Sequence, residues 1–183
     1  ISLSKIRVIE MKKIGIFWGS STDNTTTATE FMKEYLEMND HQVDVYNIED
    51  TDVDKILEYD NIIIGCPTWH IGELQEDWDS VFSDYEELNF SGKTGAFFGC
   101  GDQVGYPGNF LDAIGMLAKP FIKNGGSLIG KCPRDNYQFT GSRALDEDDK
   151  LLGLGLDYDN DDEETCEDFM VMWLEEIIDD FKD

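Results

Sequence analysis

The sequence predicts an α/β protein with a doubly wound, five-stranded parallel sheet and helices on both faces. Short β-prone runs alternate with amphipathic helical runs along the 183 residues. Two of the β-prone runs are apolar through their centres, as strands covered on both faces are. Strands that alternate with helices form parallel sheets through right-handed crossovers. The length suits one well-buried domain, which we expect to span residues 1–183.

Five β-prone runs define the expected strands, at residues 13–18, 42–47, 61–66, 94–100 and 127–131. Between and after them, large apolar residues recur at helical spacing and should face the core. The first helix offers Phe31, Tyr35 and Met38, a later one Phe110, Ile114, Leu117 and Phe121, and the last Phe169, Trp173, Ile177 and Phe181.

One segment breaks this alternation. Residues 132–151 are polar, turn-rich and acidic, and residues 152–156 then return to a strand pattern. We therefore predict an excursion that interrupts the fifth strand and then resumes it. At the other end, Met11 resembles a natural start, so residues 1–10 are interpreted as a targeting or expression remnant.

The charge balance is strongly acidic. Forty Asp and Glu against 14 Lys and Arg give a formal net charge of −26. Such a surface repels nucleic acid and anionic membranes and attracts basic protein surfaces, although solubility or adaptation to a saline interior would also explain it. No apolar run approaches the roughly 18 to 20 residues that cross a bilayer.

The four cysteines, Cys66, Cys100, Cys132 and Cys166, form no CxxC pair. This spacing argues against zinc and iron–sulfur sites, so we predict no metal. Reduced and mostly buried thiols in a reducing compartment are the expectation.

Three motifs carry the functional signal, at residues 19–25, 67–73 and 101–106. They follow the first, third and fourth expected strands. In a doubly wound sheet, ligands bind beyond the carboxyl ends of the strands. We therefore expect the three motifs to meet in one site.

The first motif has the chemistry of a phosphate site. Ser20, Thr22 and Thr25 offer hydroxyls and Asn24 an amide, before a helix expected to open at Thr25. The motif lacks both GK[ST] and GxGxxG, which argues against a nucleoside triphosphate loop and a dinucleotide fold. A hydroxyl-rich N-cap without a ligand is the alternative. Asp23 would repel a phosphate unless its side chain turns outward.

The other two motifs each present one aromatic side chain. Trp69 follows a buried strand through Pro67 and Thr68, and Tyr106 lies in a glycine-rich loop. Two aromatic faces beside a phosphate cradle suit a flat, phosphorylated ring ligand. The alternative is that both rings fill the core.

The chain resembles the long-chain flavodoxins. The matching stretches are residues 13–25, 67–79, 99–115 and 154–160, the last directly after an excursion of the kind that defines the long-chain class. The similarity extends from about residue 12 to residue 181. It implies one non-covalent FMN and a flavodoxin-like fold.

The resemblance also implies a role for each matched residue. The phosphate would be held by Ser20, Ser21, Thr22, Asp23, Asn24 and Thr25. The isoalloxazine would lie between Trp69 and Tyr106, in loops completed by Pro67, Thr68, His70, Ile71 and Gly72. Backbone groups of Cys100, Gly101 and Asp102 would meet the pyrimidine edge, and Asn109 and Asp159 the ribityl chain. The family usually has glycine at position 23, and aspartate tolerates positive φ better than most residues do.

Two features should tune the bound flavin. Glu73, Asp77, Asp79 and Asp102 lie in or beside the flavin loops, where their charge would oppose negative charge on the ring and lower its potential. The His70–Ile71 peptide occupies the place where the family turns a carbonyl toward flavin N5 on one-electron reduction. Since neither residue is glycine, we expect that turn to be strained.

These expectations define a soluble, low-potential one-electron carrier, not an enzyme, and a monomer without catalytic residues of its own. Its partners would be basic faces of redox proteins, such as a ferredoxin/flavodoxin–NADP reductase or a photosystem or oxidoreductase acceptor, in the cytoplasm or a plastid stroma. The alternatives are an NAD(P)H-dependent, FMN-containing quinone or flavin reductase on the same fold, and a receiver-like or sugar-binding domain.

Overall fold

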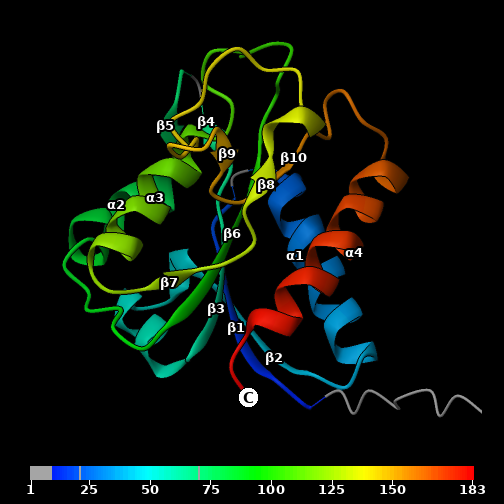
Figure 1. Ribbon diagram of the computed structural model, residues 1–183. Helices are drawn as coiled ribbons and strands as arrows, with labels where there is room; N and C mark the ends of the chain where they lie inside the picture. The colour runs from blue at the N-terminus through cyan, green and yellow to red at the C-terminus, as the bar shows by residue number, and fades with distance from the viewer. Residues whose placement is uncertain (1–9, 21, 70) are drawn as a thin grey trace, which may run out of the picture.

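The computed structural model describes residues 10–20, 22–69 and 71–183. A parallel sheet lies between two helical layers, with α1 and α4 on one face and α2 and α3 on the other (Figure 1). The described helices are α1 (Asp23–Met38), α2 (Glu76–Tyr85), α3 (Asp112–Lys123) and α4 (Glu163–Asp180), with three short 3-10 helices η1 (Ile48–Asp50), η2 (Val53–Glu58) and η3 (Arg134–Asn136). The α/β class and the two-sided cover agree with the prediction.

The central sheet has the strand order β10–β6–β3–β1–β2, with β7 also paired to β6, and every pairing is parallel. Its described strands are β1 (Lys13–Trp18), β2 (Gln42–Asn47), β3 (Asn61–Gly65), β6 (Thr94–Cys100), β7 (Ser127–Leu128) and β10 (Leu154–Leu156). Every residue of β3 and β6 is buried, as their apolar runs predicted. Ile16 of β1 lies beside Val45 on one side and Ile63 on the other.

Two separate strands share the fifth position of the sheet. β7 pairs with Thr94 and Gly95 at the start of β6, and β10 pairs with Phe98, Gly99 and Cys100 at its end. This agrees with the prediction of five strand positions whose fifth strand is interrupted and then resumed. Both pieces are shorter than predicted. Gly130 has a φ of +77°, a left-handed turn available to glycine, and it takes the chain out of the sheet soon after β7.

The excursion between β7 and β10 packs on α3 and on the loop before it. Its strands β8 (Cys132–Pro133) and β9 (Lys150–Leu151) form an antiparallel pair. Thr140 and Gly141 donate backbone hydrogen bonds of 2.7 and 2.9 Å to the carbonyl of Pro107. The carbonyl of Arg143 lies so close to Gly115 of α3 that a Cβ there would be 2.3 Å from its oxygen. That this excursion is a long-chain insertion stays a prediction.

The buried face of α1 differs from the predicted one. Met38 is 83% exposed, and Phe31 and Tyr35 are only partly buried, their rings stacked at 6.4 Å. The buried residues of α1 are smaller on average and are Thr25, Ala28, Thr29, Met32 and Leu36. The prediction followed the largest apolar side chains, whereas small residues let this helix approach the sheet closely.

The predicted buried faces of the other two helices, α3 and α4, agree with the structure except at Phe169. In α3, Ile114, Leu117 and Phe121 are fully buried, and Phe110 is buried just before the helix begins. In α4, Trp173 and Ile177 are buried, followed by Phe181, while Phe169 is partly buried.

All four cysteines are free and buried, as expected. Burial raises the thiol pKa to about 12 at Cys66, Cys100 and Cys132, and to about 11 at Cys166. The thiols therefore stay protonated at neutral pH.

The stability of the fold should depend on pH through His41. This buried ring accepts a hydrogen bond from the backbone N–H of Lys12 (3.1 Å). Burial, followed by the Lys12 charge, lowers the pKa of His41 from its usual 6.5. The unfolded chain therefore takes up the proton first, so this contribution to stability is lost as pH falls below about 6.5 through the folded-state pKa.

We expect the wild type to lose more stability than His41→Asn between about pH 7.5 and about pH 5.5, measured by urea unfolding of the apoprotein. Asparagine can still accept from Lys12 and does not titrate. Equal losses in the two proteins would contradict this assignment.

Candidate ligand-binding site

A cleft of about 280 Å³ lies beyond the carboxyl ends of the central strands. All three sequence motifs contribute to it, as do residues just after β10. Its lining residues are Thr22, Asn24, Pro67, Thr68, Trp69, Cys100, Gly101, Asp102, Tyr106, Asn109, Phe110, Tyr158 and Asp159. The structure thus brings together the three motifs that the sequence predicted would meet.

Some predicted site residues lie outside this lining, namely Ser20, Asp23, Thr25, Ile71 and Gly72. Ser21 and His70 fall outside the described residues. The expectation that the turn of the His70–Ile71 peptide is strained therefore stays a prediction. Sequence reasoning missed Phe110 and Tyr158. Tyr158 lies inside the matched stretch 154–160, and its hydroxyl is buried with no hydrogen-bond partner among the described residues.

Helix α1 begins at Asp23, two residues earlier than predicted. Its N-cap, Thr22, is extended (φ −125°), and its hydroxyl makes no capping hydrogen bond. The Thr22 hydroxyl is therefore not explained as a helix cap, as the ligand-free alternative requires. Asp23 is exposed, has no positive φ and lies outside the lining.

Thr25 is the most informative side chain at this helix start. It is fully buried, and its Oγ1 makes no hydrogen bond of normal geometry with any described residue. Beside it, the Cys100 thiol has its pKa raised by burial, an effect that the Thr25 hydroxyl partly offsets. The first turn of a helix also carries N–H groups without intrahelical partners. An unpaired hydroxyl at this position provides a donor for an anion.

The Trp69 loop is a short hairpin whose strands are β4 (Thr68–Trp69) and β5 (Glu73–Leu74). Thr68 Oγ1 accepts a hydrogen bond from the Ala113 N–H in the first turn of α3 (3.1 Å), which fixes this hairpin to the helix. Trp69 is half-buried, and Tyr106 is 50% exposed. Neither ring fills the core. The alternative that Trp69 and Tyr106 are both core residues is therefore wrong.

The Tyr106 loop is organised around the Asp102 carboxylate. This group accepts hydrogen bonds from the backbone N–H groups of Val104 (3.0 Å) and Gly105 (2.7 Å) and from Asn160 Nδ2 (2.9 Å). These bonds lower the pKa of Asp102, those from Gly105 and Asn160 most. Asp102 therefore shapes the loop and remains ionised at neutral pH.

Asp159 also lines the cleft, and its pKa is raised by burial and then by the charges of Asp102 and Asp157. The described lining holds these two carboxylates, Asp102 and Asp159, and no lysine or arginine. Of the other predicted tuning carboxylates, Glu73 and Asp79 are exposed, and Asp77 accepts from the Gln75 amide (2.6 Å).

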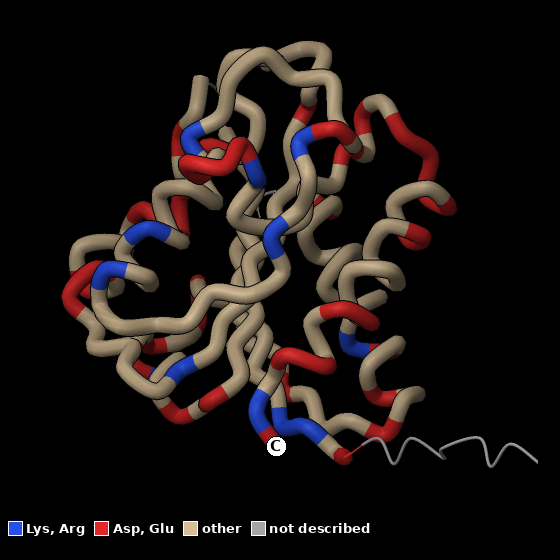
Figure 2. Tube along the Cα trace, viewed as in Figure 1, with Lys and Arg blue, Asp and Glu red and all other residues tan. Residues whose placement is uncertain are grey.

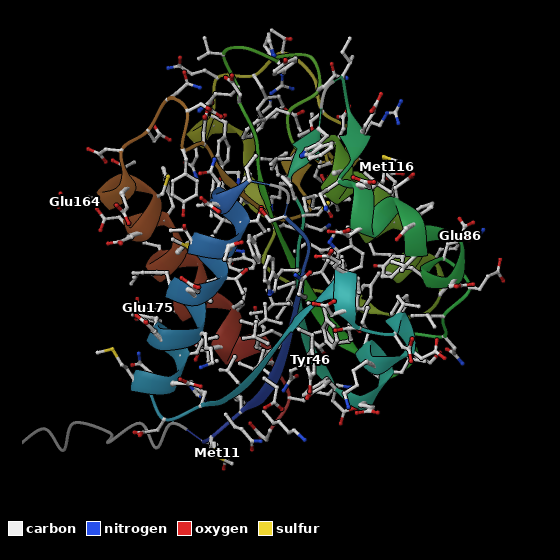
Figure 3. The ribbon with its side chains drawn as sticks, turned by 180° about the vertical axis from the view of Figure 1, so that it is seen from behind. Met11, Tyr46, Glu86, Met116, Glu164 and Glu175 are labelled. Carbon is white, nitrogen blue, oxygen red and sulfur yellow. The ribbon has the colours of Figure 1, made fainter. Side chains whose placement is uncertain are left out.

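Acidic residues also dominate the surrounding surface, on both helical layers and on the loops (Figure 2). From behind, Glu164 and Glu175 lie along α4 on one side of the molecule, and Glu86 follows α2 on the other (Figure 3).

Within the described part of the chain, no group of three or more His, Cys, Asp or Glu side chains is arranged to hold a metal ion. No helix of that part is long and apolar enough to cross a membrane.

A doubly wound sheet with a hydroxyl-lined helix start and two partly exposed rings at one cleft defines a protein that binds a flat, phosphorylated ligand. The flavodoxin family model matches residues 16–170. A flavodoxin of Synechocystis is 43% identical over 167 residues, covering 91% of this chain and 96% of its own. Flavodoxin 1 of Escherichia coli is 37% identical over 163 residues, covering 89% and 91%. The chain therefore belongs to the flavodoxin family.

A solved structure supports the same conclusion. The crystal structure of Fusobacterium nucleatum flavodoxin bound to flavin mononucleotide superposes with a TM-score of 0.86 and 27% sequence identity. The similarity covers 94% of this chain and all of that one. The fold that the sequence predicted is thus shown by both comparisons.

Proposed function

We propose that this chain is a low-potential one-electron carrier that binds a single, non-covalent FMN in the cleft. The observation that carries the proposal is the buried Thr25 hydroxyl at the start of α1, which makes no hydrogen bond of normal geometry with the described residues. A buried polar group without a partner costs about 1 to 3 kcal/mol, so it implies a partner that binds there. The phosphate of FMN is such a partner, and the F. nucleatum relative binds FMN.

The residues present fit this cofactor. Its phosphate would be held by the start of α1 with Ser20, Ser21, Thr22, Asn24 and Thr25, while Asp23 contributes its backbone N–H. Trp69 and Tyr106 would flank the ring system, and the backbone of Cys100, Gly101 and Asp102 its pyrimidine edge. Asn109 and Asp159 would serve the ribityl chain, and Pro67, Thr68, His70, Ile71 and Gly72 would complete the Trp69 loop.

FMN, when bound, accepts and gives up single electrons. The chain's own part is to set the surroundings of that chemistry. The aromatic side chains of Trp69 and Tyr106 line the cleft and would exclude water from the faces of a bound flavin. The ionised Asp102 opposes additional negative charge in the cleft, and the described lining offers no lysine or arginine to compensate it. This field lowers the reduction potential of whatever flavin is bound.

The acidic surface suggests the kind of partner. A formal net charge of −26 attracts basic faces of redox proteins, such as a ferredoxin/flavodoxin–NADP reductase or a photosystem or oxidoreductase acceptor. The complexes with these basic partners should weaken as the salt concentration rises.

We place the protein in the cytoplasm or a plastid stroma, as one domain over residues 1–183 and as a monomer.

Two titrations test the proposal. The apoprotein should take up one equivalent of FMN and become yellow, and the loaded protein should keep its colour when NADPH alone is added without oxygen. Adding a ferredoxin–NADP reductase should then bleach it. A lack of FMN binding would overturn the proposal, and direct bleaching by NADPH would favour the reductase alternative.

A further inference from the structure

A buried carboxylate, Asp112, lies behind the cleft without lining it. It is 1% exposed and is the first residue of α3. Its Oδ1 accepts a hydrogen bond from the Arg143 backbone N–H (2.7 Å), and its Oδ2 accepts one from Asn109 Nδ2 (2.9 Å). A negative charge is favourable at a helix N-terminus, which stabilises the group there.

Three segments distant in sequence converge on this carboxylate. Asn109 belongs to the Tyr106 loop and Arg143 to the excursion. The third is the Trp69 loop, because Gly72 (φ +78°) packs against the pair, and a Cβ there would lie 2.4 Å from Asp112 Oδ2 and 3.1 Å from Asn109 Nδ2. Asp112 therefore joins the two aromatic loops to the excursion.

The chemistry of a carboxylate determines which way the Asn109 amide turns. Carboxylate oxygens only accept, so they bind the NH2 group of Asn109 and not its carbonyl oxygen. The Asn109 carbonyl oxygen accepts no hydrogen bond from the described residues, and Asn109 lines the cleft. The free polar atom on this side of the cleft is thus an acceptor.

We propose that Asp112 is a positioning residue that holds the Asn109 amide with its carbonyl oxygen toward the cleft, where it accepts from a hydroxyl of the ligand. The ligand class that this acceptor selects is a polyol, which the ribityl chain of FMN supplies. The proposal rests on the proposed function. It adds the residue that sets the direction of this hydrogen bond.

Asp112→Asn tests the proposal, because an amide at position 112 can donate to the Asn109 oxygen and let that side chain turn over. Its NH2 group would then face the ligand. We expect the Kd for FMN and for riboflavin to rise about five- to ten-fold, the effect of one hydrogen bond. The Kd for lumiflavin, which lacks the ribityl chain, should stay within about two-fold. If Asp112 has only a structural role, Asp112→Asn should weaken the binding of all three flavins alike. That result would overturn the proposal.

Two further proteins complete the experiment. In an Asn109→Ala background, Asp112→Asn should change FMN affinity by less than about two-fold, since the group it acts through is absent. Arg143→Ala is the matched control. It removes an exposed guanidinium whose Nε is 3.9 Å from Asp112 Oδ2 but keeps the backbone donor, so it should bind FMN like the wild type.

The outcomes separate this proposal from the function on which it rests. If the wild-type apoprotein binds no FMN, the proposed function fails. If it binds FMN and Asp112→Asn binds equally well, only the role of Asp112 fails. Should Asp112→Asn lack the wild-type circular dichroism spectrum, Asp112→Ala replaces it in the three flavin titrations, because it also removes the acceptor for the Asn109 NH2 group. The affinity lost by Asp112→Ala must be confined to FMN and riboflavin, and an equal loss for lumiflavin overturns the proposal.

Discussion

Replacing Thr25 with valine should stabilise the apoprotein and weaken FMN binding at the same time. Valine keeps the shape of threonine but removes a buried hydroxyl that makes no hydrogen bond of normal geometry with the described residues. Removing the buried hydroxyl removes its desolvation cost, so the free energy of unfolding of the apoprotein should rise by about 1 kcal/mol. The bound phosphate loses a charge-assisted hydrogen bond, so the Kd for FMN should rise about 100-fold.

Urea unfolding of the apoprotein and fluorescence titration with FMN measure the two effects. Thr27→Val is the matched control, because Thr27 lies on the same helix, is only half-buried and does not line the cleft. It should change neither quantity by more than about 0.5 kcal/mol. A Thr25→Val protein that is less stable without FMN, or that binds FMN as well as the wild type, would contradict the assignment of Thr25 to the phosphate.

Gly115→Ala should lower the free energy of unfolding by about 3 kcal/mol, or roughly 9 °C in the melting temperature. In an exposed helix alanine would be favourable, but here its Cβ would lie 2.3 Å from the Arg143 carbonyl oxygen and 2.8 Å from the Ala144 nitrogen. Backbone atoms cannot swing aside as a side chain does. The excursion must move away from α3 or the helix must shift.

Thermal unfolding by circular dichroism measures this loss, with Gly108→Ala as control. A Cβ on Gly108 meets no atom within 4 Å, so that variant should change the free energy of unfolding by less than about 0.5 kcal/mol. Gly115→Ala should also weaken FMN binding, because the displaced Arg143 is the residue whose backbone N–H binds Asp112. Unchanged stability would mean that the excursion does not pack on α3 as described.

Local sequence patterns predicted the sheet and the place of the site well. Apolar runs such as Ile62, Ile63 and Ile64 are short and fully buried, so their pattern marks a central strand directly. The topology rule then located the cleft, because all three motifs follow strand ends. Both inferences need only information that is local in the sequence.

The features that sequence reasoning missed depend on contacts distant in sequence. Met38 belongs to an apolar stripe, yet it is exposed, because the part of α1 that meets the sheet is set by Ala28 and Thr29. Tyr158 reaches the cleft only because β10 pairs with the end of β6. The contacts of Asp112 come from three segments that no local pattern connects.

The buried cysteines have a consequence for the chemical durability of the protein. Reduced flavins react with oxygen to give peroxide, and the thiolate is the form of cysteine that peroxide attacks. With a pKa of about 12, each of Cys66, Cys100 and Cys132 is a thiolate in roughly one molecule in 10⁵ at pH 7. Cys100 lines the cleft itself, where such by-products would form. Burial therefore keeps these thiols in the protonated form, which peroxide attacks least readily.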